Sequence, residues 1–118
     1  MQQKELPRWP PGTVLILVTQ GSQPHAIPVS AAVRAGPQRA LLGLARSRES
    51  LERLGAAPEV GLVILCGDDV AVTAYGVARV LEGDLTDGMA AVQVEISRVQ
   101  DHGRDTFTIH SGVGWRWT

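Results

Sequence analysis

Short runs of apolar and β-branched residues, separated by turns rich in glycine, proline and aspartate, make up most of the chain. Runs of this length, bounded by turn residues, are typical of strands rather than helices. The pattern predicts seven strands, at 13–19, 25–33, 39–45, 60–66, 70–81, 90–99 and 106–117. Turns at this spacing are typical of an antiparallel barrel. We therefore expect a mainly β fold, an antiparallel barrel of six to seven strands with one short helix.

The helix is predicted at 48–56, where Leu51 and Leu54 fall on one face because they are three positions apart. Pro58 follows and ends it. A second proline, Pro28, interrupts the predicted strand 25–33. Proline has no backbone N–H to donate, so that strand is predicted to be at an edge, to be bulged, or to offer its backbone to something other than a strand.

The segment 39–50 carries the predicted strand into the predicted helix and places Arg46, Ser47, Arg48 and Ser50 at the helix start. The unpaired N–H groups there carry a partial positive charge, so acidic side chains are favoured and cations are disfavoured. A bound phosphate would reverse this, because it accepts hydrogen bonds from arginine, serine and backbone N–H together. Two interpretations follow: an anion site, or an ordinary Ser47 N-cap beside solvated arginines.

Length and charge exclude several classes of protein. The 118 residues predict a single domain, 1–118. A formal net charge of −1, from 11 basic and 12 acidic residues, argues against nucleic-acid binding. The only cysteine, Cys66, lies in an apolar run and is expected to be a buried free thiol. The apolar run 14–18 is too short for a signal peptide or a membrane span, so we expect a cytoplasmic protein that binds no membrane.

The remaining conspicuous residues are aromatic or ionisable. His25, His102 and His110 have no spacing typical of a metal site, and none is predicted. Trp115 and Trp117 alternate along the last predicted strand. Paired aromatics there either close a barrel end or a dimer seam, or stack on a cofactor. Neither a Ser-His-Asp arrangement nor a glycine-rich nucleotide loop is readable, so no catalytic residue is assigned.

Four stretches, taken in order, resemble a known family. They are Pro24-His-Ala-Ile-Pro-Val-Ser30, Ser47-Arg48 before a short helix, Ala57-Pro-Glu-Val60 and Ala74-Tyr-Gly-Val-Ala-Arg-Val80. Together they resemble the pyridoxamine 5′-phosphate oxidase-like FMN-binding split β-barrel proteins over nearly the whole chain. The resemblance implies a split barrel and a homodimer that binds FMN, or in some branches a deazaflavin, FAD or haem, in a groove at the subunit interface.

The resemblance also implies where such a cofactor would bind. Ser47 and Arg48 would hold the phosphate, with Arg46 and Ser50 assisting, and the ring would lie against 27–31 and 43–45. Trp115 is a further candidate contact. The predicted cofactor-binding set is Ile27, Pro28, Val29, Ser30, Gly43, Leu44, Ala45, Arg46, Ser47, Arg48, Ser50 and Trp115.

The sequence departs from the family at three points. Glu49 stands where the family has lysine after Ser-Arg, and Ala71 stands where it has glutamine. Residues for a pyridoxamine phosphate substrate are absent near the C-terminus, so no vitamin oxidase activity is predicted. We expect a small flavin-type oxidoreductase that serves a small-molecule redox substrate or a nicotinamide donor. The alternative is a non-catalytic carrier or sensor, or a barrel that has lost its cofactor.

Overall fold

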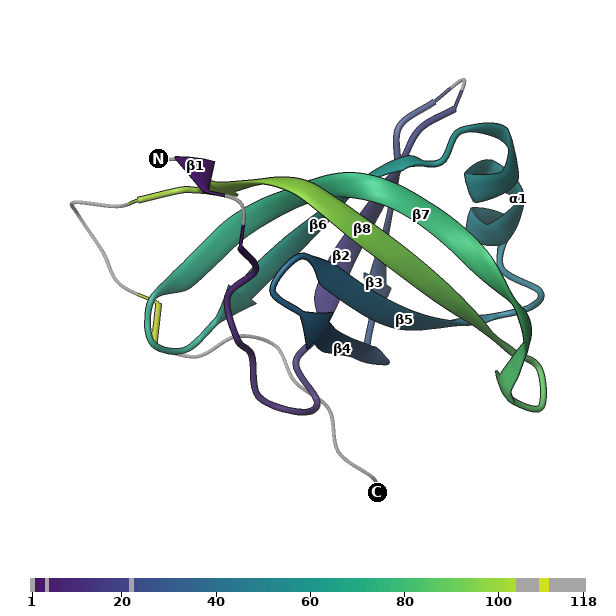
Figure 1. Ribbon diagram of the computed structural model, residues 1–118, viewed down its shortest axis with the longest axis horizontal. Helices are drawn as coiled ribbons and strands as arrows, with labels where there is room; N and C mark the ends of the chain where they lie inside the picture. Colours follow the sequence, from purple (N-terminus) through teal and green to yellow (C-terminus); the bar gives the residue numbers. More distant parts are fainter. Residues whose placement is uncertain (1, 4, 22, 104–108, 111–118) are drawn as a thin grey trace.

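The computed structural model describes residues 2–3, 5–21, 23–103 and 109–110, which form one antiparallel sheet and one helix (Figure 1). The elements are β1 (Gln2–Gln3), β2 (Leu15–Thr19), β3 (His25–Val29), β4 (Ala32–Gly36), β5 (Arg39–Ala45), α1 (Glu49–Ala56), β6 (Glu59–Cys66), β7 (Val70–Thr86) and β8 (Met89–Asp101). The predicted mainly β, antiparallel fold with one short helix is confirmed.

Seven strands follow one another in the order β3-β2-β6-β7-β8-β5-β4, and the short β1 pairs with β8 outside this path. The sheet curls strongly, because β3 and β4 are consecutive in sequence yet stand at the two ends of the path (Figure 1). No strand pairing joins these two ends within the described chain. They meet instead at the corner between β3 and β4, where the Gly43 N–H donates to the Ala31 carbonyl at 2.8 Å.

The predicted strand 25–33 is divided by this corner into β3 and β4. β3 pairs with β2 at one end of the strand order, whereas β4 pairs with β5 at the other end. The break falls at Ser30 and Ala31, just after Pro28. Pro28 therefore lies on an edge strand of the described sheet, which is one of the three possibilities that its missing N–H allowed.

The β7–β8 hairpin is longer than predicted. Its strands continue through the expected loop 82–88 to a tight turn, in which Thr86 pairs with Met89 and Gly88 adopts a φ of 76°. The pairing shifts register twice between Val80 and Thr86, and residues 82–88 are exposed. A strand segment that buries no side chain shows no apolar alternation, which is why the sequence pattern ended too early.

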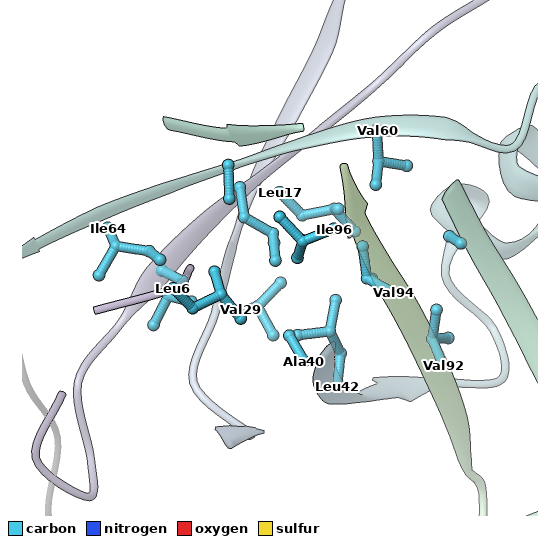
Figure 2. Close-up of a cluster of buried hydrophobic side chains, with 14 of the residues drawn as sticks. Leu6, Leu17, Val29, Ala40, Leu42, Val60, Ile64, Val92, Val94 and Ile96 are labelled. Atoms are coloured by element: carbon cyan, nitrogen blue, oxygen red, sulfur yellow. The ribbon is translucent and has the colours of Figure 1, made fainter. Parts of the chain in front are cut away.

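The inward-facing side chains of the curled sheet, from strands near both ends of the strand order, meet in one core (Figure 2). Leucine, isoleucine and valine alternate inward along the strands, and the largest fully buried apolar side chains are Leu15, Leu17, Leu42, Leu62, Ile64, Val92, Val94 and Val99. Cys66 is buried, as predicted. Burial, and secondarily the negative charge of Asp68, raises the pKa of the Cys66 thiol, so the thiol stays protonated and unreactive near neutral pH.

Helix α1 packs at one end of the sheet, near β2 and β7 (Figure 1). Leu54 is buried and Leu51 packs against the core, so the predicted apolar face is confirmed. The helix begins one residue later than predicted, because Arg48 has extended backbone and serves as the N-cap. Among the described residues no helix is long and apolar enough to cross a membrane.

The last predicted strand, 106–117, falls almost entirely outside the described residues. Ile109 and His110, which are described, are not in a strand. The two hydrogen bonds between Asp69 and Ile109 hold this segment against the β6–β7 turn: the Asp69 N–H donates to the Ile109 carbonyl at 3.1 Å, and the Ile109 N–H donates to Asp69 Oδ1 at 2.9 Å.

Gly76 is required by the close approach of β8, and this gives a first prediction. A Cβ at this position would clash with the Glu95 carbonyl oxygen, at the point where β7 and β8 shift register. We expect Gly76→Ala to lower the free energy of unfolding by about 1–3 kcal/mol in a urea titration. Gly36→Ala is the control, because its new Cβ would meet only Arg39 Cβ at 3.9 Å. Equal stability of the two variants would contradict this account.

Candidate functional site

A hollow opens where the two ends of the sheet approach each other. It has a volume of about 120 Å³ and receives residues from the β3–β4 corner, the end of β5, the N-cap of α1 and the start of β8. Its lining is Pro28, Val29, Ser30, Ala31, Gly43, Leu44, Ala45, Arg48 and Met89. We call this hollow the split site.

An edge strand and a glycine form two walls of the split site. Pro28 and Val29 belong to an edge strand, so one side of that strand has no neighbouring strand in the described chain. Gly43 lies opposite, and a Cβ there would stand 3.2 Å from Ala31 Cβ and 3.2 Å from Leu85 Cδ1. The absence of a side chain at Gly43 therefore lets the corner and the β7–β8 hairpin approach β5 closely. A flat ligand could lie against such a surface and bind exposed backbone groups.

Arg48 supplies the positive charge of the split site. Its side chain is exposed, it lines the hollow, and it makes neither an ion pair nor a hydrogen bond to any described residue. It also stands at the N-cap of α1 without a side-chain capping bond. The guanidinium and the partial positive charge of the helix start thus act in the same place, which favours an anion.

Arg46, the other predicted cation, is engaged elsewhere. Its Nε donates to Asp84 Oδ1 at 2.7 Å and its Nη2 donates to the Gly83 carbonyl at 2.9 Å. Its backbone N–H donates to the Gly88 carbonyl at 2.8 Å. Arg46 therefore fastens the end of β5 to the β7–β8 hairpin and does not line the split site.

Two further predicted residues at the helix start also lie outside the lining. Ser50 is fully buried, and its Oγ is 3.4 Å from Nε2 of His25, which lies on β3. Ser47 is exposed beside Arg48. Glu49, which departs from the family pattern, has its Oε2 at 3.1 Å from Arg53 Nε and at 3.5 Å from His25 Nδ1. Its carboxylate is thus directed toward these partners.

The structure brings together seven of the twelve predicted residues: Pro28, Val29, Ser30, Gly43, Leu44, Ala45 and Arg48. Ile27 packs against the core, and Trp115 lies outside the described residues. Met89 lines the site but was not predicted from the sequence. Its position directly after the Asp87-Gly88 turn was the available signal, because that turn brings the start of β8 opposite the end of β5.

A second, apolar hollow adjoins the split site on the outer surface of β2, β3 and β6. It has a volume of about 190 Å³ and is lined by Val14, Ile16, Pro28, Val63 and Leu65. Pro28 lines both hollows. Leu65 is 43% exposed. We call this surface the apolar face.

The split site by itself is small for an organic cofactor. Ligand pockets usually measure roughly 300–1,000 Å³ and enclose most of the ligand, whereas this hollow measures about 120 Å³. The residues could serve as one wall of a flavin site, with Arg48 for a phosphate. A cofactor of that size would need a second wall in addition to this lining.

No protein-family model matches the sequence, and no curated protein matches it. Solved structures do match. A candidate pyridoxamine 5′-phosphate oxidase from Lactobacillus delbrueckii superposes with a TM-score of 0.64 at 20% identity, over 74% of this chain and 83% of that one. An F420 reductase gives 0.63 at 12% identity, over 75% and 90%. The flavin reductase PheA2 gives 0.59 at 13% identity, over 91% and 90%.

These neighbours are split-barrel proteins of the pyridoxamine 5′-phosphate oxidase-like type. The likeness at these identities is one of fold, and it confirms the split-barrel architecture that the sequence resemblance implied. Flavin-dependent oxidoreductases occur among them.

The different surroundings of Arg46 and Arg48 predict opposite effects on stability. Arg46→Ala removes a half-exposed ion pair and a carbonyl contact, so unfolding should become easier by up to about 1 kcal/mol. Arg48→Ala removes an unpaired cation from a helix start, so stability should stay equal or rise by a few tenths of a kcal/mol, roughly. Thermal melting of the ligand-free variants tests this. A clear loss of stability in Arg48→Ala would show that Arg48 has a structural role.

Proposed function

We propose that the protein is a homodimer that binds a flavin-type cofactor and acts as a small oxidoreductase. FMN is the first candidate, and a deazaflavin, FAD or haem are alternatives. The observation that carries the proposal is the unpaired Arg48 guanidinium at the start of α1, beside an open edge of backbone. A phosphate on Arg48 would place the attached ring along the β3–β4 corner.

The neighbours support the same class of reaction. One is named F420 reductase and another is named flavin reductase. Both names describe electron transfer through a flavin or deazaflavin, so we propose a nicotinamide donor or a small redox molecule as the second substrate. We also propose that the protein works in the cytoplasm.

In this proposal the chain would hold the cofactor in place and provide an electrostatic environment for it, and no side chain would act as a general acid or base. A bound flavin supplies the redox chemistry. Arg48 and the first N–H groups of α1 bind the phosphate, which fixes the distance from the helix start to the ring. Backbone groups of the β3–β4 corner orient the ring. Leu44 and Met89 exclude water from one side of it, since both line the split site.

A second copy of the chain is proposed as the missing wall. The apolar face meets the split site at Pro28, so a partner seated on that face would also cover the split site. Exposed apolar area of this kind commonly marks a protein interface. A second copy that covers the split site would also enlarge the enclosed volume toward the size that an organic cofactor needs.

A non-catalytic binding protein is the second candidate. The distribution of charge favours it, because Arg46 is held by Asp84 and leaves Arg48 as the only arginine in the lining. Ala71 also stands on β7 with only a methyl group where the family offers an amide. Weaker binding of the phosphate is what a carrier or a sensor that releases its ligand would need.

Titration with FMN and with riboflavin tests the anion role of Arg48. We expect saturable FMN binding and weaker riboflavin binding, because riboflavin lacks the phosphate. Arg48→Ala should weaken FMN roughly 10- to 100-fold, since a charge-assisted hydrogen bond contributes about 1.5–3 kcal/mol. Its effect on riboflavin should be small. Arg79→Ala, an exposed arginine outside the lining, is the control.

Two results would contradict the proposal. If FMN and riboflavin bind equally well, the helix start is only a cap. If Arg48→Ala and Arg79→Ala behave alike, the phosphate binds elsewhere. Saturable binding of FMN without turnover of NADH or NADPH would favour the non-catalytic candidate.

Sedimentation tests the proposed partner. The wild type should sediment as a dimer, and Leu65→Glu should shift it toward monomer, because a carboxylate on the apolar face cannot be buried against a second copy without a large desolvation cost. Val33→Glu is the matched control, since Val33 is also exposed, at 56%, but lies on β4. A wild type that remains monomeric at high concentration would rule out this interface.

A further inference from the structure

A third hollow crosses the outer surface of β2, β6, β7 and β8. It has a volume of about 490 Å³, which lies within the range of small-molecule pockets. It shares no lining residue with the split site or with the hollow of the apolar face. Polar and charged side chains reach it, among them Gln20, Glu59 and Arg98. The apolar face offers none, so the two surfaces suit different occupants.

A row of four residues runs across the middle of this hollow. Strand register places Val18 opposite Gly61, Gly61 opposite Tyr75, and Tyr75 opposite Arg98. Adjacent strands are about 4.8 Å apart, so the missing side chain at Gly61 leaves a gap of about two strand spacings between Val18 and Tyr75. We call this gap the Gly61 slot.

The fold itself does not require glycine at position 61. Gly61 has no positive φ, and a Cβ there would meet Thr73 Cγ2 and Val18 Cβ at 3.8 Å, which is ordinary contact. Gly76 differs, because its missing side chain is demanded by the Glu95 carbonyl. Glycine inside a strand destabilises the folded state and often marks the close approach of a ligand. Gly61 therefore leaves the slot open, and the strand does not need glycine at this position in order to fold.

Tyr75 and Arg98 form one end of the slot. The guanidinium carbon of Arg98 lies 4.0 Å from the centre of the Tyr75 ring. This stacking occupies a face of the guanidinium and leaves its N–H edge available. Arg98 makes no ion pair within the part of the chain that is described. An arginine held flat with an unused donor edge is well arranged to bind a carboxylate or a phosphate.

The structure points to a second ligand site, in which the Gly61 slot binds a flat aromatic anion of mononucleotide size. The ring enters between Val18 and Tyr75 above Gly61, and the anionic group binds Arg98. Glu59 lies two residues before Gly61 on β6 and is exposed, so a hydrogen-bond donor on the ring is preferred at that end. The proposal does not depend on the cofactor of the split site.

Adenosine 5′-monophosphate is a suitable probe, with adenosine and ribose 5-phosphate as partial analogues. Binding is measured by heteronuclear NMR titration of the full chain. We expect AMP to bind saturably, with shifts at β6 and β7, and each analogue to bind at least tenfold more weakly. Gly61→Val should weaken AMP at least tenfold because it fills the slot. Gly36→Val, a glycine-to-valine change on β4, is the matched control.

Arg98→Gln keeps the slot open and serves if Gly61→Val folds poorly. It should lower AMP affinity to that of adenosine and leave adenosine unchanged. Arg48→Ala should not alter AMP binding, and the FMN-induced shifts at the β3–β4 corner should persist in both slot variants. These two results separate this site from the split site.

Four outcomes would overturn the proposal: no AMP binding by the wild type, wild-type affinity in Gly61→Val, no effect of Arg98→Gln, or loss of AMP binding in Arg48→Ala. If Gly61→Val instead converts a dimer to a monomer in sedimentation while AMP never binds, the slot receives a second copy of the chain and not a small molecule.

Discussion

The arrangement of β3 and β4 controls the rest of this structure. They are separated by only two residues, yet they pair with opposite ends of the strand order. A sheet with ordinary right-handed twist meets this requirement only by curling until its ends approach. Among the described residues strand pairing does not close the gap between the two ends, so the corner at Ser30 and Ala31 faces a hollow rather than a described strand. The split site is thus a consequence of topology before any side-chain chemistry is considered.

Charge at the start of α1 is distributed so that one cation remains available. The two arginines are two positions apart in sequence but have different contacts. Arg46 binds Asp84 and the Gly83 carbonyl, whereas Arg48 lines the split site. Glu49 could neutralise Arg48, but its carboxylate contacts Arg53 and lies near His25. The helix start therefore keeps one guanidinium that no acid of the described chain pairs with, although Glu52 adds a second acid to the first turn. Because the described residues offer only this guanidinium to an anion there, both a reductase and a reversible carrier are compatible with the site.

The sequence was sufficient for the strands that bury one face, because apolar alternation and turn residues are local signals. For Pro28 the missing donor is a property of the residue itself, and it limited the strand to three possibilities, of which the structure shows the edge position. The sequence was insufficient for the partner of Arg46, because Asp84 is 38 positions away and an exposed ion pair leaves no pattern. Met89 was missed for a similar reason: the hairpin that carries it buries little and shows no periodicity. The clustering of the β3–β4 corner with the end of β5 was therefore predictable, whereas the contacts of distant side chains were not.

The edge position of Pro28 also affects whether copies of this chain can add to one another edge to edge. An edge strand with a full row of free N–H and C=O groups is a template for further strands, and such addition propagates into fibres. Pro28 removes a donor from β3, and the polar Arg34 lies within β4 at the other end of the sheet. Addition of further strands at these two edges, in the hydrogen-bonding direction perpendicular to the strands, is thereby discouraged. Face-to-face contact through the outer surface of the sheet, as in the proposed dimer, would close after two copies and give a finite assembly.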